Sequence, residues 1–426
     1  MKGFEIAEVE VNEVSVRDLL FNKTMLFAYV LIGIALYGIY GIVHERYFML
    51  AANAFDAGAH PGSREVAEAM REAIFGAGGE VHREAPWTLF ISNYMYMIYS
   101  GSGIIFLVAL AELANVHIIK QTAAGFMTLG LSIVLAGLFT IALDLNVLHM
   151  HWMFLTPNVG AGMWLMLPLY AIYIPFVLFE IYLLLTKNRT WARKIAIGIL
   201  ILSIVIDIIE YYIQAKLFNM NTARHYWTTY PMLPLYFIVS SFLAAAGIMI
   251  LYAFIEYGEK FKYELARLIL FLKKIAVVSM LGLAAYEASA FLFIDKEVAN
   301  IILFGDYKYI FYIYIFLAIG LPFMLLAYKM IRKETHYVMT GIAAVSIIIG
   351  TYIGRIIFVY GGNAHPMSDR MGTGFQKYSE YESIKEFIFV MPSLSEICIV
   401  VGSVGVVLIV YKAFDLFLSV SKISEH

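Results

Sequence analysis

The chain has 426 residues, of which 62% are hydrophobic and 15% are charged. An average soluble domain has about half apolar and about a quarter charged residues, so this composition excludes an ordinary soluble protein. The net charge of −2 gives no indication of a nucleic-acid partner. The single cysteine, Cys398, excludes a disulfide framework and an Fe–S cluster held by this chain alone.

Apolar runs follow one another along the chain, each about 20 residues long, which is the length that crosses a bilayer as a helix. The expected fold is therefore an all-α polytopic membrane protein. We expect residues 1–24 to form an N-terminal segment, residues 25–417 the transmembrane domain and residues 418–426 a tail. The expected spans are 25–43, 88–111, 120–143, 162–186, 194–213, 231–256, 268–294, 308–331, 337–360 and 396–417.

The short connections between spans predict the orientation. The connection 186–194, TKNRTWARK, holds four positive charges, whereas the connection 145–162 holds none. Positive charges favour the cytoplasmic side of a membrane. We therefore expect the chain to lie in the cytoplasmic membrane with both termini in the cytoplasm. The long loops 44–87 and 361–395 would then face outside.

An internal repeat is visible in the second and sixth spans. SGSGIIFL at Ser100–Leu107 parallels AAAGIMIL at Ala244–Leu251, an offset of 144 residues. The same offset carries spans three to five close to spans seven to nine. We expect two four-helix bundles of the same orientation, at about 88–213 and 231–360, as in other membrane folds with parallel repeats.

Polar and ionisable side chains gather at the outer end of the first expected bundle. Such groups are costly at membrane depth and by default suggest function. Together they predict one wall of a pocket at the outer interface, although most tyrosines of the chain must belong to interfacial belts or to packing. The candidates are Asn93, Tyr94, Tyr96, Asp144, His149, Glu210 and Tyr211.

Three charged residues of the second bundle allow two interpretations. Glu287, Arg355 and Glu396 form either a second site or a structural ion pair of Arg355 with one of the glutamates.

Two glutamates near the inner ends of spans two and four are also open to two interpretations. Glu112 and Glu180 mark either a proton path, with Tyr170 and Tyr173 as relays along span four, or side chains that simply reach the inner water.

Haem and metal sites are not expected. Haem in a helix bundle needs histidines that face each other at membrane depth, and none of the ten histidines lies clearly within a span. His149 and His151 have only Asp144 nearby as a further ligand, which does not indicate a metal site.

Two stretches carry a resemblance to the NrfD/polysulfide reductase membrane-subunit family. LDLNVLHMHWMFLTPN, which ends at Asn158, resembles that family's Asp-Leu-Gly-Arg-Pro…Trp…Pro-Asn segment. The matching residues are Asp144, Leu145, Trp152, Pro157 and Asn158, while Asn146, Val147 and Leu148 replace Gly-Arg-Pro. GRIIFVYGG followed by MPSLSEICIVVG resembles the ten-helix DsrP and HmeB type, with Arg355, Pro392, Ser393 and Glu396 matching.

The resemblance implies a membrane subunit of a respiratory complex that exchanges electrons with menaquinone. Such a subunit has no haem or Fe–S cluster of its own and no catalytic centre for the final acceptor. It implies a quinone pocket in the first bundle. Because the polar candidates converge at the outer end of this bundle, we expect Asp144 or His149 to be the proton acceptor of that pocket. The resemblance also implies a ferredoxin-like Fe–S subunit on the outer face, further membrane or cytochrome subunits, and a link to sulfur-compound or heterodisulfide metabolism.

A secondary transporter, or a proton-translocating protein without quinone chemistry, is the alternative. Repeats and intramembrane acids fit both classes. A transporter site is expected near the midplane with interrupted helices, whereas the charges here gather at the outer end. Pro168, Pro175 and Pro322 are the residues expected to kink spans four and eight.

Overall fold

The structure is a computed structural model that describes most of the chain. The described ranges are 3–6, 9–44, 87, 89–144, 155–186, 190–220, 225–229, 232–258, 262–294, 296–305, 307–332, 337–364 and 392–422. The predicted His149 and His151, and nearly all of the loops 44–87 and 361–395, lie outside these ranges.

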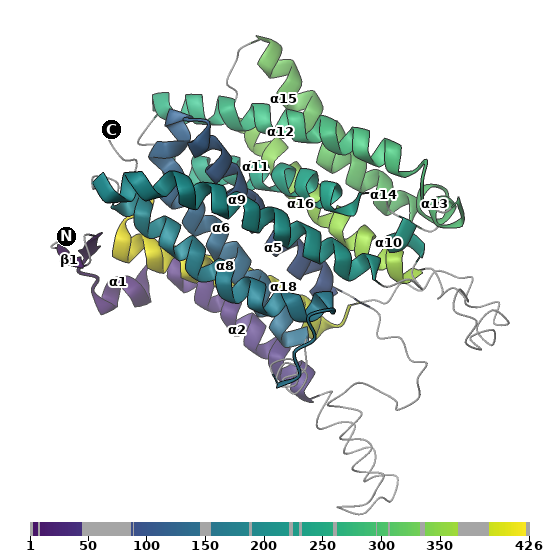
Figure 1. The fold of residues 1–426 in the computed structure, drawn as a ribbon, viewed down its shortest axis with the longest axis horizontal. Coiled ribbons are helices and arrows are strands. Elements are labelled where there is room, and N and C mark those ends of the chain that lie inside the picture. Colours follow the sequence, from purple (N-terminus) through teal and green to yellow (C-terminus); the bar gives the residue numbers. More distant parts are fainter. Residues whose placement is uncertain are drawn as a thin grey trace, which may run out of the picture.

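Ten helices of the described ranges are long and apolar enough to cross a membrane, which confirms the predicted all-α polytopic membrane fold. They alternate in direction, so both termini lie at one end of the molecule (Figure 1). The spanning elements are α2 (Lys23–Val43), α5 (Leu89–Leu113), α6 (His117–Asp144), α8 (Gly162–Leu185), α9 (Thr190–Asn219), α11 (Leu233–Tyr257), α12 (Lys262–Ala290), α14 (Lys308–Ile315) continuing into α15 (Leu321–Arg332), α16 (Tyr337–Ala364) and α18 (Leu394–Leu418).

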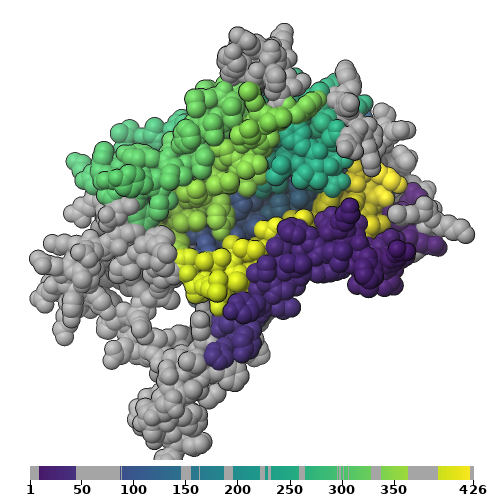
Figure 2. Space-filling model, turned by 180° about the vertical axis from the view of Figure 1, so that it is seen from behind, coloured from purple at the N-terminus to yellow at the C-terminus, as the bar shows by residue number. Residues whose placement is uncertain are grey.

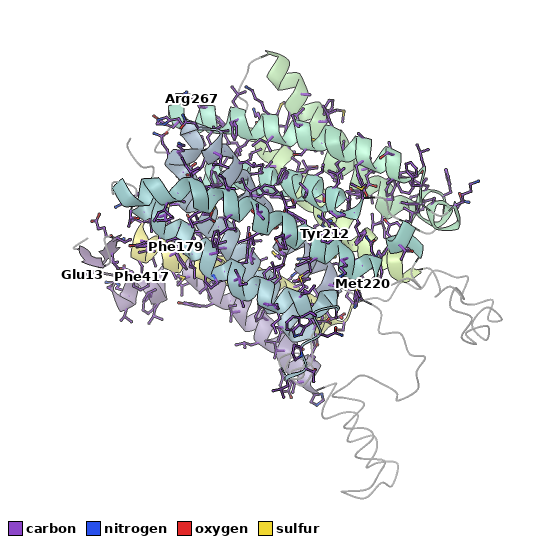
Figure 3. All side chains as sticks on the ribbon, viewed as in Figure 1. Glu13, Phe179, Tyr212, Met220, Arg267 and Phe417 are labelled. Atoms are coloured by element: carbon purple, nitrogen blue, oxygen red, sulfur yellow. The ribbon has the colours of Figure 1, made fainter. Side chains whose placement is uncertain are left out.

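We call the end with the termini the terminal end and the opposite one the loop end. Figure 3 shows Glu13 and Phe417 at the terminal end and Met220 toward the loop end. Short helices lie at the loop end, namely α10 (His225–Thr229) and α13 (Lys296–Leu303). Phe179 and Tyr212 are exposed on the outer faces of α8 and α9, where a bilayer would contact them.

The helices form two groups with the same pattern of neighbours. In the first group α5 packs on α6 and α9, and α8 packs on α9 and α6. In the second group α11 packs on α12 and α16, and α15 packs on α16 and α12. This is the arrangement that two four-helix bundles would give, while duplication of the sequence itself stays a prediction.

The helix α5 is the centre of the molecule. Nearly all of its residues are buried, because α6, α9, α11, α16 and α18 surround it. Small residues permit this close packing. A Cβ atom added at Gly103 would lie 2.8 Å from the Ser241 carbonyl oxygen of α11, so the two bundles meet there at backbone distance.

The first and last spans form a pair beside the bundles. Helix α18 packs along α2 and also on α6, with Gly402 and Gly405 against the α2 backbone. Figure 2 shows this purple and yellow pair below the green second bundle, with a hollow between them that is floored by first-bundle residues.

The terminal end is tied together by a hairpin. The strands β1 (Gly3–Ile6) and β2 (Val9–Asn12) pair antiparallel and precede the short helix α1 (Val16–Phe21). Asn12 Nδ2 donates to the Leu416 carbonyl oxygen at 2.9 Å and to Ser419 Oγ at 2.7 Å. The hairpin lies within residues 1–24, which the sequence predicts as an N-terminal segment. Through Asn12 it caps the end of α18.

Prolines within spans act differently in the two bundles. Helix α8 continues through Pro168 and Pro175. Before Pro322 the helix widens into the π-helical segment η2 (Phe316–Gly320). Because proline has no N–H, the Leu317 carbonyl oxygen cannot bond to residue 322, and it accepts a bond from Ser346 Oγ at 2.7 Å instead.

The tight contact at Gly103 gives a stability prediction. Gly103→Leu should force α5 and α11 apart and lower the free energy of unfolding by about 1–3 kcal/mol, the usual cost of overpacking. Thermal unfolding of the purified protein in detergent measures this. Gly198→Leu on α9 is the matched control, because a Cβ there meets nothing within 4 Å. Equal losses in both variants would contradict close packing at Gly103.

Candidate functional site

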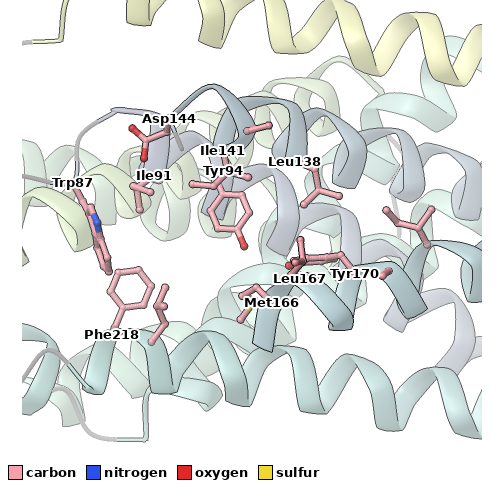
Figure 4. A pocket seen from close by; sticks show the side chains of 14 residues that line it. Trp87, Ile91, Tyr94, Leu138, Ile141, Asp144, Met166, Leu167, Tyr170 and Phe218 are labelled. Carbon is pink, nitrogen blue, oxygen red and sulfur yellow. The ribbon is translucent and has the colours of Figure 1, made fainter. Parts of the chain in front are cut away.

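A cavity opens into the loop end of the first bundle, between α5, α6, α8 and α9 (Figure 4). Its volume is about 420 Å³, within the range of about 300–1,000 Å³ typical of small-molecule sites. Trp87 and Asp144 lie at one end of it, and Tyr94 and Tyr170 lie deeper. The wall is mostly apolar, with Ile91, Leu138, Ile141, Ala142, Met166, Leu167, Ala171, Ile174, Leu217 and Phe218 completing it.

The Tyr94 hydroxyl is one of the polar groups of the cavity wall. Tyr94 comes from the buried helix α5, and its hydroxyl points between the walls toward Tyr170 (Figure 4). Tyr170 of α8, which also lines the cavity, is the side chain that this hydroxyl approaches. A ligand with a carbonyl oxygen can therefore accept a bond from this hydroxyl.

Behind the cavity wall, Tyr170 is held by two residues of α9. Tyr170 Oη donates to Glu210 Oε1 at 2.6 Å, and Gln214 Nε2 donates to Tyr170 Oη at 2.6 Å. Glu210 and Gln214 are one helical turn apart, so both reach the same hydroxyl. Both are fully buried, and the second oxygen of Glu210, Oε2, has no hydrogen-bond partner among the described residues.

A buried polar stripe continues from Glu210 toward the terminal end along α8 and α9. Asp207 lies one turn from Glu210, is fully buried, and neither of its carboxyl oxygens makes a hydrogen bond within the described chain. Tyr173 lies beside it. Further along, Ser203 Oγ donates to Glu180 Oε2 at 3.2 Å, and Glu180 is only 3% exposed. The stripe thus spans the bundle interior from the cavity to Glu180.

The inner glutamates are brought together. Glu112, in the last turn of α5, lies within electrostatic reach of Glu180. Glu180 does not extend to the protein surface, contrary to the interpretation in which it reaches water at a helix end.

Some of the residues predicted for the pocket meet there and others do not. Tyr94 and Asp144 line the cavity, and Glu210 is one side chain behind it. Asn93 instead donates from Nδ2 to Thr140 Oγ1 at 3.0 Å and to Ser403 Oγ at 3.2 Å, facing α6 and α18.

Tyr96 and Tyr211 also point away from the cavity. The Tyr96 ring packs against Tyr352 of α16 at 5.0 Å between centroids. The Tyr211 hydroxyl is 2.7 Å from Ser241 Oγ, at the seam between the bundles. Neighbours on a helix are turned by about 100° per residue, so residues close in sequence face different partners.

Each of the three charged residues predicted for the second bundle has a hydrogen-bond partner in the structure. Glu287 accepts a bond from Tyr314 Oη at 2.8 Å, and Arg355 donates from Nη2 to Ser240 Oγ at 2.6 Å. Glu396 closes a capping box at the start of α18, because it accepts a bond from the Ser393 N–H at 2.8 Å and donates its own N–H to Ser393 Oγ.

Sequence reasoning places Asp207 beside Glu210 at the outer end of span five, but it does not find two other residues of the site. Tyr170 is expected only as a relay, and Gln214 is not a candidate because α9 continues to Asn219 rather than ending at residue 213. Residues 203, 207, 210 and 214 are polar and are spaced by three or four positions, so the sequence itself predicts that they share one face of a helix. No group of three metal-ligating side chains occurs in the described part of the chain.

Comparison with known proteins places this geometry in a family. The chain is 28% identical over 203 residues to a selenate reductase subunit of Mesobacillus selenatarsenatis. The aligned region covers 46% of this chain and 45% of that protein. The aligned part is thus less than half of that relative. A profile of the polysulfide reductase family, NrfD_2, matches residues 78–369, which include both helix groups and the cavity. The chain therefore belongs to the NrfD/polysulfide reductase family of multi-pass membrane proteins, whose members are membrane subunits of reductase complexes.

Proposed function

We propose that this chain is the menaquinone-binding membrane subunit of a respiratory oxidoreductase complex and that the cavity of the first bundle is its quinone site. The cavity carries the proposal, because it combines an apolar wall with two tyrosine hydroxyls and a carboxyl group. A quinone head group has flat apolar faces and two carbonyl oxygens, so it needs such a combination.

The residues of the cavity would act as donors and proton carriers. The Tyr94 hydroxyl would donate to one carbonyl oxygen at the deep end of the cavity. Asp144, at the other end, would exchange a proton with the second carbonyl oxygen. His149 is a second candidate for this role, and it lies outside the described residues. Conversion between quinone and quinol moves two electrons and two protons, and this chain's residues would carry only the protons.

The electrons would pass to or from a ferredoxin-like Fe–S subunit. We place that partner at the loop end, over the connections 145–161 and 220–232, with the loops 44–87 and 361–395 around it. Support comes from Asp144 and Trp87, which put the cavity at this end, and from the uncharged connection 145–162, which suits burial against protein. The loop end would face outside and both termini the cytoplasm. Further membrane or cytochrome subunits, and a substrate among sulfur compounds or heterodisulfides, complete the proposal.

The buried stripe supports a proton connection between the cavity and the terminal end. The chain of acids runs through Glu210, Asp207 and Glu180 to Glu112, with Tyr170 and Tyr173 between them. If quinone is reduced at the cavity, this stripe would deliver protons from the cytoplasm. The same buried acids are the observation that favours the alternative function, proton translocation without quinone chemistry.

Asp144 provides a direct test of the quinone site. Asp144→Asn should lower quinol turnover by about 10²-fold or more, because it removes a proton-exchanging group while preserving shape. Turnover is measured in the purified complex with a soluble electron acceptor, after gel analysis has shown that all subunits are present. Glu13→Gln, an exposed acid at the terminal end, is the control and should change nothing. Wild-type turnover in Asp144→Asn would remove Asp144 from the mechanism.

Glu180 tests the proton connection. In liposomes containing the complex, Glu180→Gln should slow or uncouple proton movement while quinone affinity stays the same, because Glu180 lies far along the stripe from the cavity. Glu264→Gln, on a different helix, serves as the matched control. The path does not exist if a Glu112→Gln, Glu180→Gln double variant keeps both wild-type turnover and wild-type proton uptake.

Trp152 tests the place of the partner. Chymotrypsin should cut after Trp152 in the isolated subunit and not in the intact complex, because the connection 145–161 would be covered. Mass spectrometry of the fragments reads the result. Equal cleavage in both preparations would place the Fe–S subunit elsewhere.

A further inference from the structure

A second pocket lies at the terminal end, opposite the end into which the first-bundle cavity opens. Its walls come from the N-terminal hairpin, the end of α18 and the helices α6 and α8, and its volume is about 280 Å³. Figure 1 shows the hairpin beside the yellow end of α18. The hydrogen bonds of Asn12 to Leu416 and Ser419 join these two segments, so the two ends of the chain form one continuous wall of the pocket.

The pocket crosses the boundary between the apolar spans and the polar segments beyond them. Leu184, Leu185 and Leu418 line it from the last turns of α8 and α18. On the same two helices Phe179 and Phe417 are exposed, so membrane lipid would contact the protein beside the pocket (Figure 3). A ligand with an apolar part and a polar head group, such as a phospholipid at the membrane surface, matches this wall.

The polar part of the pocket carries one acidic and one basic side chain. Glu10 lines it from the hairpin, and Lys422 lines it from the segment that follows α18. Glu10 and Asn12 are two positions apart on strand β2 and therefore share the face that Asn12 turns toward α18. The two charges thus enter the pocket from different segments, and the ligand that they match has a positive and a negative group.

The neighbouring sequence has the same division of charge. The hairpin register pairs Glu5 with Glu10, which adds a second acid to this segment. The connection 186–194, which holds four positive charges, follows Leu185 directly in the chain. The acids thus belong to the hairpin, and the bases belong to the segments that follow α8 and α18.

We propose that this pocket binds the head group of a phosphatidylethanolamine from the adjacent membrane leaflet. The phosphate of the head group would lie at Lys422, and its ammonium group would donate a hydrogen bond to the Glu10 carboxylate. The three leucines would contact the glycerol backbone and the first carbons of the acyl chains. The bound lipid would join both ends of the chain to α8, whether or not the first-bundle cavity binds quinone.

The two charges distinguish phosphatidylethanolamine from other membrane phospholipids. Phosphatidylglycerol has the phosphate but no cation for Glu10. Phosphatidylcholine has a cation, but its methyl groups leave no N–H that could donate to the carboxylate. Because Glu10 and Lys422 are exposed to water, which screens their charges, the expected discrimination is modest.

Native mass spectrometry of the full chain in detergent tests the site. The three lipids, with identical acyl chains, are titrated separately and the affinity of the first bound molecule is compared. Wild type should bind phosphatidylethanolamine about two- to fivefold more tightly than phosphatidylcholine, the size that an exposed ion pair contributes. Glu10→Gln should abolish this preference, whereas Lys422→Gln should weaken all three lipids by a similar factor, because each carries the phosphate.

Matched variants control for the loss of a surface charge. Glu13→Gln and Lys23→Gln change exposed residues that are not among those lining the pocket, and both should keep the wild-type preference. Glycerophosphoethanolamine, which has the same head group without acyl chains, should compete only weakly, and affinity equal to that of the lipid would overturn a membrane lipid as the ligand. Equal wild-type affinities for the three lipids, tighter binding of phosphatidylglycerol, or an unchanged preference in Glu10→Gln overturns the proposal.

Discussion

The enclosure of α5 is the constraint on which the rest of the structure depends. A helix surrounded by other helices must satisfy a different neighbour on every face. Small residues let those neighbours approach, as at Gly103 against Ser241. The remaining positions then decide the chemistry of each face, and Tyr94 is the α5 side chain that supplies a hydroxyl to the cavity.

Buried polar groups in this fold are organised along the helix faces that meet inside each bundle. In a membrane interior an unpaired polar group is costly, so such groups are expected to pair with one another or to face a ligand or a water path. Tyr170, Glu210 and Gln214 are paired, while within the described chain both oxygens of Asp207 and Oε2 of Glu210 are not. In the proposed proton connection these oxygens would contact protons or water, while the paired groups hold the cavity wall.

Sequence reasoning predicts the ten spans, the family and the bundle that carries the cavity. The spans can be predicted from hydropathy and length, because the thickness and apolar interior of the bilayer constrain both. The positions of individual side chains are predicted less well. Asn93 and Tyr96 flank Tyr94 in the sequence, yet the helical turn sends them to α18 and α16.

Helix length and side-chain pairing cannot be obtained from hydropathy. Gln214 and Lys216 lower the hydropathy of the end of α9, so the predicted span ends at residue 213 and Gln214 is missed. The sequence leaves open whether Arg355 belongs to a second site or pairs with an acid, and the structure places aromatic rings around its guanidinium group. The central claim, that the first-bundle cavity binds quinone, is tested most directly by photolabelling the intact complex with an azidoquinone and mapping the labelled peptides. The account predicts labels on the cavity segments of α5, α6 and α8, between residues 91–94, 138–144 and 166–174, and competition by unlabelled menaquinone. Labels confined to the hollow between α18 and the second bundle would contradict it.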